Sequence, residues 1–223
     1  MLRAVVFDFD GVIADSEPLH FRALRECLRP EGVVIDEAEY YSTYVAYDDR
    51  TCIRLALERH GRPYDAERVT AVAERKAEIF DELLRRIPFF PGVPELVEAL
   101  ARDLPIAIAS GARREEIEKI LEGGGLRAHF RAIVGADDCD RTKPDPEPYL
   151  RAVALLARDT PGLEPAECVA FEDTVAGIAS ARAAGLKVVG VATTYPADKL
   201  GAAHRVVPAI ADVTRSELDA LFA

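Results

Sequence analysis

The sequence of 223 residues predicts a doubly wound α/β fold with a helical insertion near its start. Five short apolar runs, each followed by turn residues and a helical pattern, indicate strands at residues 4–7, 106–109, 132–134, 168–171 and 188–192. Continuous apolar runs are typical of strands buried on both faces, as in a parallel sheet. Their alternation with helical segments is the pattern of a doubly wound fold.

The interval over residues 16–88 breaks this alternation, because it holds helical patterns and no convincing strand. The patterns are PLHFRALRECL, DDRTCIRLALERHG and DAERVTAVAERKAEIFDELLRR. Acids typical of helix starts, Asp48 and Asp65, precede or open two of them. We therefore expect a core of residues 1–15 and 89–223, with an all-α domain of residues 16–88 inserted after the first strand.

Charge and composition exclude several classes of protein. The formal net charge is −11, whereas a general nucleic-acid binder needs a basic surface. No apolar stretch approaches the ~20 residues of a membrane span, and the N-terminus lacks a signal-peptide pattern. The four cysteines are scattered without a CxxC pair, which favours reduced thiols: Cys27, Cys52, Cys139 and Cys168. We expect a cytoplasmic protein with no nucleic-acid and no membrane partner.

Four polar clusters follow the apolar runs or lie shortly beyond them: Asp8 with Asp10, Ser110 with Gly111, Lys143 in RTKPDPEPY, and Glu172 with Asp173. In an open parallel sheet the carboxyl ends of the strands share one edge, and ligands bind there. Lys143 fits this edge less directly, because it lies several residues beyond its strand. We expect the four clusters to converge on one site.

The acids of these clusters indicate metal-assisted chemistry on phosphorus. Asp8, Glu172 and Asp173 would repel one another at short range, and a divalent cation relieves that repulsion. Hard oxygen ligands and a phosphate substrate favour Mg²⁺. A carboxylate at such a site can attack phosphorus, and we assign this role to Asp8. Asp10 would then protonate the leaving oxygen and later deprotonate water.

Lys143 and the Ser110 hydroxyl would neutralise and orient the phosphoryl oxygens. Structural alternatives exist for each cluster, since a D-x-D pair after a strand can belong to a turn and Ser110 can cap the helix ARREEIEKIL. Lys143 can be a surface lysine, and Glu172 with Asp173 can be first-turn acids of a helix that Thr174 caps. The matched order of all four clusters makes coincidence a poor explanation.

The segments FDFDGVIADSEPLH, IASG, KPDPEPY and FEDTVAGIASARAAG resemble the four motifs of the haloacid dehalogenase superfamily. The resemblance covers about residues 4–200 and implies a Rossmann-like core with its first strand central. It implies a nucleophile at Asp8, an acid/base with a Mg²⁺-binding carbonyl at Asp10, phosphate binding by Ser110, Gly111 and Lys143, and metal binding by Glu172 and Asp173. The dehalogenase branch lacks the second aspartate of the first motif, so Asp10 indicates phosphoryl transfer.

The insertion is similar to the helical cap of the beta-phosphoglucomutase-like branch. His20, Arg50 and Lys76 resemble cap and hinge positions that face the substrate in that branch. The alternatives are a packed hinge residue for His20, an exposed helix residue for Arg50, and pairing of Lys76 with a neighbouring glutamate. The glycine-rich hinge of that branch reads YVAYDDR here, so Ala46 replaces a small flexible position, which argues against a true mutase.

We therefore expect a Mg²⁺-dependent phosphatase that hydrolyses a small phosphorylated metabolite, with a sugar phosphate as the first candidate, through an aspartyl-phosphate intermediate. The resemblance implies a monomer. Two alternatives stay open. One is a beta-phosphoglucomutase-type phosphotransferase, which shares every catalytic residue named above, and the other is a non-catalytic relative that binds a ligand.

Overall fold

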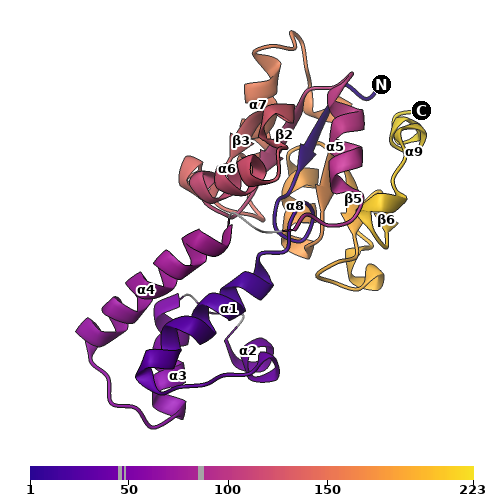
Figure 1. Cartoon of the computed structure of the whole chain (residues 1–223). Coiled ribbons are helices and arrows are strands. Elements are labelled where there is room, and N and C mark those ends of the chain that lie inside the picture. Colours follow the sequence, from indigo (N-terminus) through magenta and orange to yellow (C-terminus); the bar gives the residue numbers. More distant parts are fainter. Residues whose placement is uncertain (45–46, 48, 85–87) are drawn as a thin grey trace. The chain divides into compact units, whose positions relative to one another are not determined.

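The computed structural model describes residues 1–44, 47, 49–84 and 88–223 (Figure 1). The chain forms two compact units. Met1–Asp15 and Pro88–Ala223 make up the core unit, and Ser16–Ile87 make up the helical unit. Two positions of interest in the sequence, Ala46 and Asp48, lie outside the described residues.

A six-stranded sheet forms the centre of the core unit, with the order β3-β2-β1-β4-β5-β6. The strands are β1 (Ala4–Phe7), β2 (Ile106–Ala109), β3 (Phe130–Val134), β4 (Cys168–Glu172), β5 (Lys187–Val191) and β6 (Arg205–Val207). Every neighbouring pair is parallel. This order, which runs outward in both directions from β1, is that of a Rossmann-like sheet, so the predicted fold class is confirmed.

The strands follow from burial of their residues on both faces of the sheet. All four residues of β1 are buried, and Ala4 and Val6 pack in the same apolar cluster as Tyr149 of α7 (Glu147–Ala157). The ring of Phe7 stacks on that of Phe171, with centroids 4.9 Å apart. The five predicted strands are present within two residues of their expected ends.

Two departures from the predicted strands have local causes. β3 begins at Phe130, two residues before the apolar run, because the exposed Arg131 interrupts the pattern. β6 (Arg205–Val207) was not predicted, since its three residues pair only with β5 at the edge of the sheet and are mostly half-buried. An edge strand of this length leaves no continuous apolar run.

Helices cover the sheet of the core unit (Figure 1). They are α5 (Val93–Ala101), α6 (Arg114–Gly123), α7 (Glu147–Ala157), α8 (Val175–Ala183) and α9 (Arg215–Ala220). Short 3₁₀ turns are η2 (Arg127–His129), η3 (Ala136–Asp138), η4 (Pro165–Glu167), η5 (Ala197–Leu200) and η6 (Ile210–Asp212). In the ranges that the structure describes, no helix is both long and apolar enough to span a bilayer.

The helical unit has an apolar cluster of its own, to which Leu24, Ile53, Leu57 and Val72 belong. Its elements are α1 (Glu17–Leu28), η1 (Arg29–Glu31), α2 (Glu37–Thr43), α3 (Asp49–Arg59) and α4 (Ala66–Leu84). The three predicted helical patterns are confirmed, and the short α2 was not predicted. As expected, Asp65 caps the start of α4 by accepting a hydrogen bond from the Arg68 N–H at 2.8 Å.

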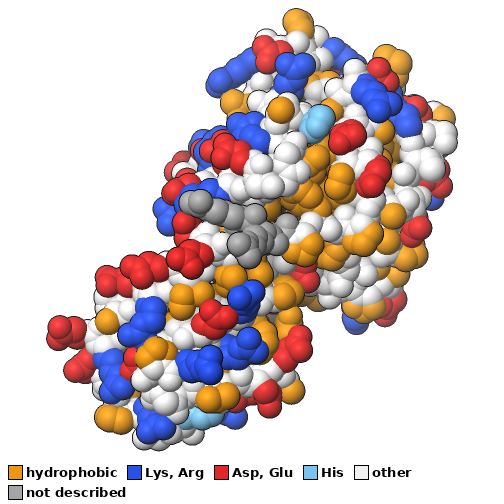
Figure 2. Space-filling view, in the orientation of Figure 1, with side chains coloured by type: hydrophobic (Ala, Val, Ile, Leu, Met, Phe, Trp, Pro, Cys, Tyr) orange, Lys and Arg blue, Asp and Glu red, His pale blue; other side chains and the backbone are white. Residues whose placement is uncertain are grey.

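Charged side chains of both signs are interspersed on the face that Figure 2 shows, so the described part of this face is not a basic patch. The four cysteines are free, and three of them are buried. Burial raises the pKa of the thiols of Cys27 and Cys168 to about 12, which keeps them protonated at neutral pH.

His20 links α1 to α4 within the helical unit. Its ring stacks on Phe80 with centroids 4.1 Å apart, and its Nδ1 lies 3.2 Å from the Lys76 Nζ. Burial, and then the positive charge of Lys76, lower the pKa of His20 to about 4, against the smaller opposing effect of Asp49. The folded protein therefore holds a neutral imidazole here at neutral pH.

We expect His20 to make the protein less stable in mild acid. Its pKa is about 4 when folded and about 6.5 when unfolded, so the unfolded chain binds the extra proton between these values, and stability falls as the pH drops through this window. Compared with His20→Gln, the wild type should lose about 1–2 kcal/mol of unfolding free energy between about pH 7 and about pH 4.5. Urea unfolding followed by circular dichroism measures this, and parallel pH profiles of the two proteins would contradict it.

Candidate active site

Polar residues follow three neighbouring strands at one edge of the sheet. Asp8 follows β1, Ser110 follows β2, Glu172 ends β4 and Asp173 comes next. Because β1 lies between β2 and β4 and all three are parallel, their carboxyl ends lie side by side. The N–H of Asp8 donates to the carbonyl of Phe171 at 2.9 Å, which fixes the backbone at this edge.

Lys143 reaches the same edge from the loop between η3 and α7. Its Nζ lies 2.8 Å from Asp8 Oδ1 and 2.6 Å from Glu172 Oε1, and only 13% of its side chain is exposed. It also lies 5.1 Å from the centroid of the Tyr149 ring. The alternative of a surface lysine is therefore wrong, because the ammonium is an ion-pair partner of two buried carboxylates.

Asp8, Glu172 and Asp173 form a buried acidic cluster, in which each offers an oxygen within 4.8 Å of the others. Among the residues that the structure describes, Asp173 Oδ1 is the one buried side-chain oxygen or nitrogen without a hydrogen-bond partner. Leaving such an atom unpaired is costly, and a cation would satisfy it. Carboxylate oxygens in this arrangement fit a hard divalent cation such as Mg²⁺.

The charges of the cluster also favour a bound cation. Burial, followed by repulsion from Glu172, raises the pKa of Asp8 well above its ordinary value, although Lys143 opposes the shift. Burial is also the main cause that raises the pKa of Asp173 to about 6. Burial disfavours the Lys143 ammonium, but Asp8 and Glu172 outweigh it and raise its pKa. One ammonium thus faces three carboxylates, an imbalance that favours a bound cation.

The turn that carries Asp10 lies against this cluster. Asp10 is half-buried, and the N–H of Ile13 closes the turn by donating to the Phe9 carbonyl at 2.8 Å. Gly11 has φ of 78°, and a Cβ there would lie 1.9 Å from Asp173 Oδ2. Only glycine therefore allows the backbone next to Asp10 to approach the acids this closely.

Ser110 is buried at the end of β2, and its Oγ accepts a hydrogen bond from the Ala112 N–H at 3.0 Å. The alternative that Ser110 caps the next helix is wrong, because α6 begins at Arg114 and Arg113 takes the N-cap position. Gly111 is exposed, and a Cβ there would meet nothing within 4 Å. Gly111 thus borders open space directly after the buried Ser110.

Glu172 and Asp173 precede α8 rather than lying in its first turn, so that alternative is also wrong. The predicted cap by Thr174 is confirmed, since its Oγ1 accepts a hydrogen bond from the Gly177 N–H at 3.0 Å. The same hydroxyl donates to Glu172 Oε2 at 3.0 Å. The start of α8 therefore orients one acid of the cluster.

The structure adds two residues that the sequence did not single out. The buried Tyr149 donates its hydroxyl to Glu172 Oε1 at 2.8 Å, and the Thr194 side chain hydrogen-bonds to Asp173. Tyr149 ends the segment KPDPEPY, where a buried aromatic six residues after Lys143 was a usable signal. Thr194 follows β5 as the other polar residues follow their strands, and this was a second signal.

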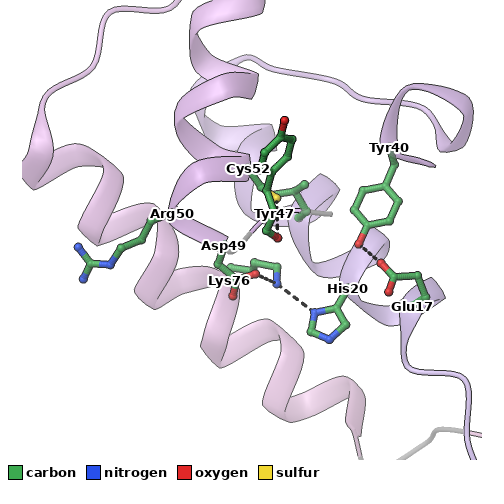
Figure 3. A pocket seen from close by; sticks show the side chains of 9 residues that line it. Glu17, His20, Tyr40, Tyr47, Asp49, Arg50, Cys52 and Lys76 are labelled. Carbon is green, nitrogen blue, oxygen red and sulfur yellow. Dashed lines mark hydrogen bonds and ion pairs between the residues drawn. The ribbon is translucent and has the colours of Figure 1, made fainter. Parts of the chain in front are cut away.

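His20, Arg50 and Lys76 line a pocket of about 510 Å³ within the helical unit (Figure 3). Lys76 is buried and pairs with Asp49 of α3, so the alternative of a neighbouring glutamate partner is wrong. The exposed Arg50 points away from His20 and Lys76, and its Nη1 lies 3.1 Å from Thr70 Oγ1. The pocket therefore combines an ion pair with a neutral imidazole.

Several known proteins are similar to this chain over most of its length. Protein CbbY of Rhodobacter capsulatus is 32% identical to this chain, with 93% of each chain covered. Fructose-1-phosphate phosphatase YqaB of Escherichia coli is 33% identical over 84% of this chain and 95% of its own length. The crystal structure of a putative beta-phosphoglucomutase from Thermotoga maritima has a TM-score of 0.77 and 28% identity, and it covers 92% of this chain and 94% of that one. Residues 2–185 match the model of the haloacid dehalogenase-like hydrolases, and the chain belongs to this family of enzymes.

Proposed function

We propose that the protein is a Mg²⁺-dependent phosphatase that hydrolyses a small phosphorylated metabolite, with sugar phosphates as the substrate class. The observation that carries this proposal is the acidic cluster beside Lys143, in which one oxygen of Asp173 is buried without a partner. The similarity to a fructose-1-phosphate phosphatase supports the substrate class.

The reaction has two steps, and Asp8 and Asp10 take part in both. In the first step a carboxylate oxygen of Asp8 attacks phosphorus, the bond from phosphorus to the ester oxygen breaks, and that oxygen takes a proton from Asp10. In the second step water attacks the phosphorus of the aspartyl phosphate and gives a proton to Asp10. The bond from phosphorus to the Asp8 oxygen then breaks, which releases inorganic phosphate and restores both acids.

Lys143, Ser110 and Gly111 bind the phosphoryl group in this proposal. The Lys143 ammonium lies 2.8 Å from Asp8 Oδ1, so a phosphoryl group that reaches the nucleophile also meets a positive charge. Ser110 offers its hydroxyl at the end of the neighbouring strand, and Gly111 leaves space beside it for the phosphoryl oxygens.

The residues that would hold Mg²⁺ are the carboxylates of Asp8 and Asp173 and the backbone carbonyl of Asp10. The Glu172 carboxylate, which the resemblance also assigns to the metal, lies beside them and pairs with Lys143. The unpaired Asp173 Oδ1 is the feature of these residues that fits a cation best. Bound Mg²⁺ would supply positive charge that offsets the repulsion among the acids and the phosphoryl oxygens.

We assign the helical unit the role of a cap that excludes bulk water and selects the leaving group. His20, Arg50 and Lys76 are the proposed substrate-facing residues of this unit, in keeping with their shared pocket. The four free thiols support a reducing, cytoplasmic location, and we propose that the enzyme acts as a monomer.

Asp8→Asn should abolish turnover, because the amide keeps the shape of the side chain but is a poor nucleophile. We expect hydrolysis of p-nitrophenyl phosphate to fall at least ~1000-fold, measured in the presence of Mg²⁺. The matched control is Asp103→Asn, an exposed aspartate of the core unit, which should retain wild-type activity. Undiminished activity in Asp8→Asn would refute the nucleophile, and an inactive wild type would favour a non-catalytic relative.

Removal of the metal should abolish activity, and Mg²⁺ should stabilise the fold. At a Mg²⁺ concentration about 100 times its Kd, the free energy of unfolding should rise by about 2.7 kcal/mol, which raises the melting temperature by several degrees. Scanning calorimetry with and without EDTA measures this, with NaCl of equal ionic strength as control. Asp173→Asn should lose the stabilisation, so an equal Mg²⁺-induced shift in that variant would contradict the proposed site.

A phosphotransferase of the beta-phosphoglucomutase type is the second candidate, favoured by the similarity to a putative enzyme of that name. Both reactions begin with the same aspartyl phosphate, so the acceptor distinguishes them. With β-glucose 1-phosphate we expect inorganic phosphate as the product, because water accepts the phosphoryl group. Enzyme-coupled detection of glucose 6-phosphate is the decisive measurement, since its accumulation without phosphate release would identify a mutase.

A further inference from the structure

Glu172 differs from the other two acids of the cluster because the chain already supplies donors to both of its oxygens. Oε1 accepts from the Lys143 Nζ at 2.6 Å and from the Tyr149 hydroxyl at 2.8 Å. Oε2 accepts from the Thr174 hydroxyl at 3.0 Å and from the backbone N–H groups of Asp173 and Thr174, each at 3.2 Å. A carboxylate has about four lone-pair positions, so these five donors leave none for a cation.

Asp173 and Asp8 differ from Glu172 because the chain supplies fewer donors to their carboxylates. Asp173 Oδ1 is buried without a partner among the described residues, although the carboxylate also has a hydrogen bond with Thr194. Asp8 has Lys143 at its Oδ1. Both carboxylates therefore retain lone pairs that a metal ion could take, whereas Glu172 would have to give up a donor first.

The place of Glu172 is fixed by the packing around it. A Cβ on Gly177 would lie 1.8–2.0 Å from its carboxylate atoms, so the carboxylate rests directly on the backbone at the start of α8. Its partner Tyr149 has no exposed surface and lies in the apolar cluster of the core unit. A buried phenol of this kind needs a hydrogen-bond acceptor, and Glu172 is that acceptor.

We propose that Tyr149 is a positioning residue that, together with Thr174, fixes Glu172 as the counter-ion of Lys143 and leaves Asp8 and Asp173 as the metal-binding side chains. This inference deepens the proposed function and rests on it. Loss of the phenol hydroxyl leaves Glu172 Oε1 to Lys143 alone, which draws the ammonium away from Asp8 and from the phosphoryl group. Tyr149 thus acts on the reaction through the position of Lys143.

The test compares Tyr149→Phe, Glu172→Gln and Asp173→Asn in the whole chain, with Tyr44→Phe as the matched control. Tyr44 is also fully buried and donates its hydroxyl to a carboxylate, Glu39 Oε1 at 2.7 Å, but it belongs to the helical unit. Calorimetric titration with MgCl₂ gives the Kd for Mg²⁺, and hydrolysis of p-nitrophenyl phosphate at saturating Mg²⁺ gives kcat and KM. Circular dichroism gives the melting temperatures.

We expect Tyr149→Phe to keep the Kd for Mg²⁺ within about twofold of the wild type and to raise KM about tenfold. Tyr44→Phe should lower the melting temperature to a similar extent without changing KM, which separates positioning from a purely structural role. Asp173→Asn should weaken Mg²⁺ binding at least ~100-fold, and Glu172→Gln less than ~10-fold, as for a residue that does not bind the metal directly.

Two results would overturn the inference. Equal loss of Mg²⁺ affinity in Glu172→Gln and Asp173→Asn would make Glu172 a direct ligand of the metal. This comparison tests the role of Glu172 even if Tyr149→Phe does not fold. Unchanged KM in a folded Tyr149→Phe would remove the positioning role. A wild type that binds Mg²⁺ but hydrolyses no phosphate ester would refute the proposed function alone, since the calorimetric comparison would still decide the role of Glu172.

Discussion

The ion pairs of Lys143 with Asp8 and Glu172 are the interaction on which the candidate site depends. Three carboxylates lie together in a buried position, and one ammonium offsets only part of their charge. Buried ions of this kind are tolerated only when partners surround them. Three groups surround the charges here: the backbone at the start of α8, the Tyr149 hydroxyl and the turn at Gly11. They stabilise the buried charges at this edge of the sheet.

The parallel sheet explains how residues far apart in sequence reach one place. β1 is central, and its neighbours β2 and β4 come from segments about a hundred and more residues away. Because their carboxyl ends coincide, each strand delivers its polar residue to the same edge without a long loop. Lys143 is the exception, since it comes from the loop before α7. The position of its side chain is fixed by its two carboxylate partners and not by the end of a strand.

The sequence predicts most of this arrangement because burial on both faces leaves continuous apolar runs, and polar residues directly after such runs stand out. Asp8, Ser110 and Glu172 are recognisable for that reason. Tyr149 is harder to recognise, because its place in KPDPEPY does not distinguish it from an aromatic residue of the core until its hydroxyl partner is known. The contacts of Glu172 are likewise hidden, since they depend on how α8 begins, and β6 is too short to give a pattern.

The two apolar clusters have no residue in common, since the helical unit packs its own helices around Leu24 and Ile53 while the core unit packs on its sheet. A substitution within the apolar cluster of the helical unit therefore replaces no residue of the apolar cluster that packs on the sheet. Such separation lets evolution alter the shape of the pocket in the helical unit while the phosphorus chemistry stays constant. A chain built in this way can give rise to enzymes that differ in what they recognise and share how they react.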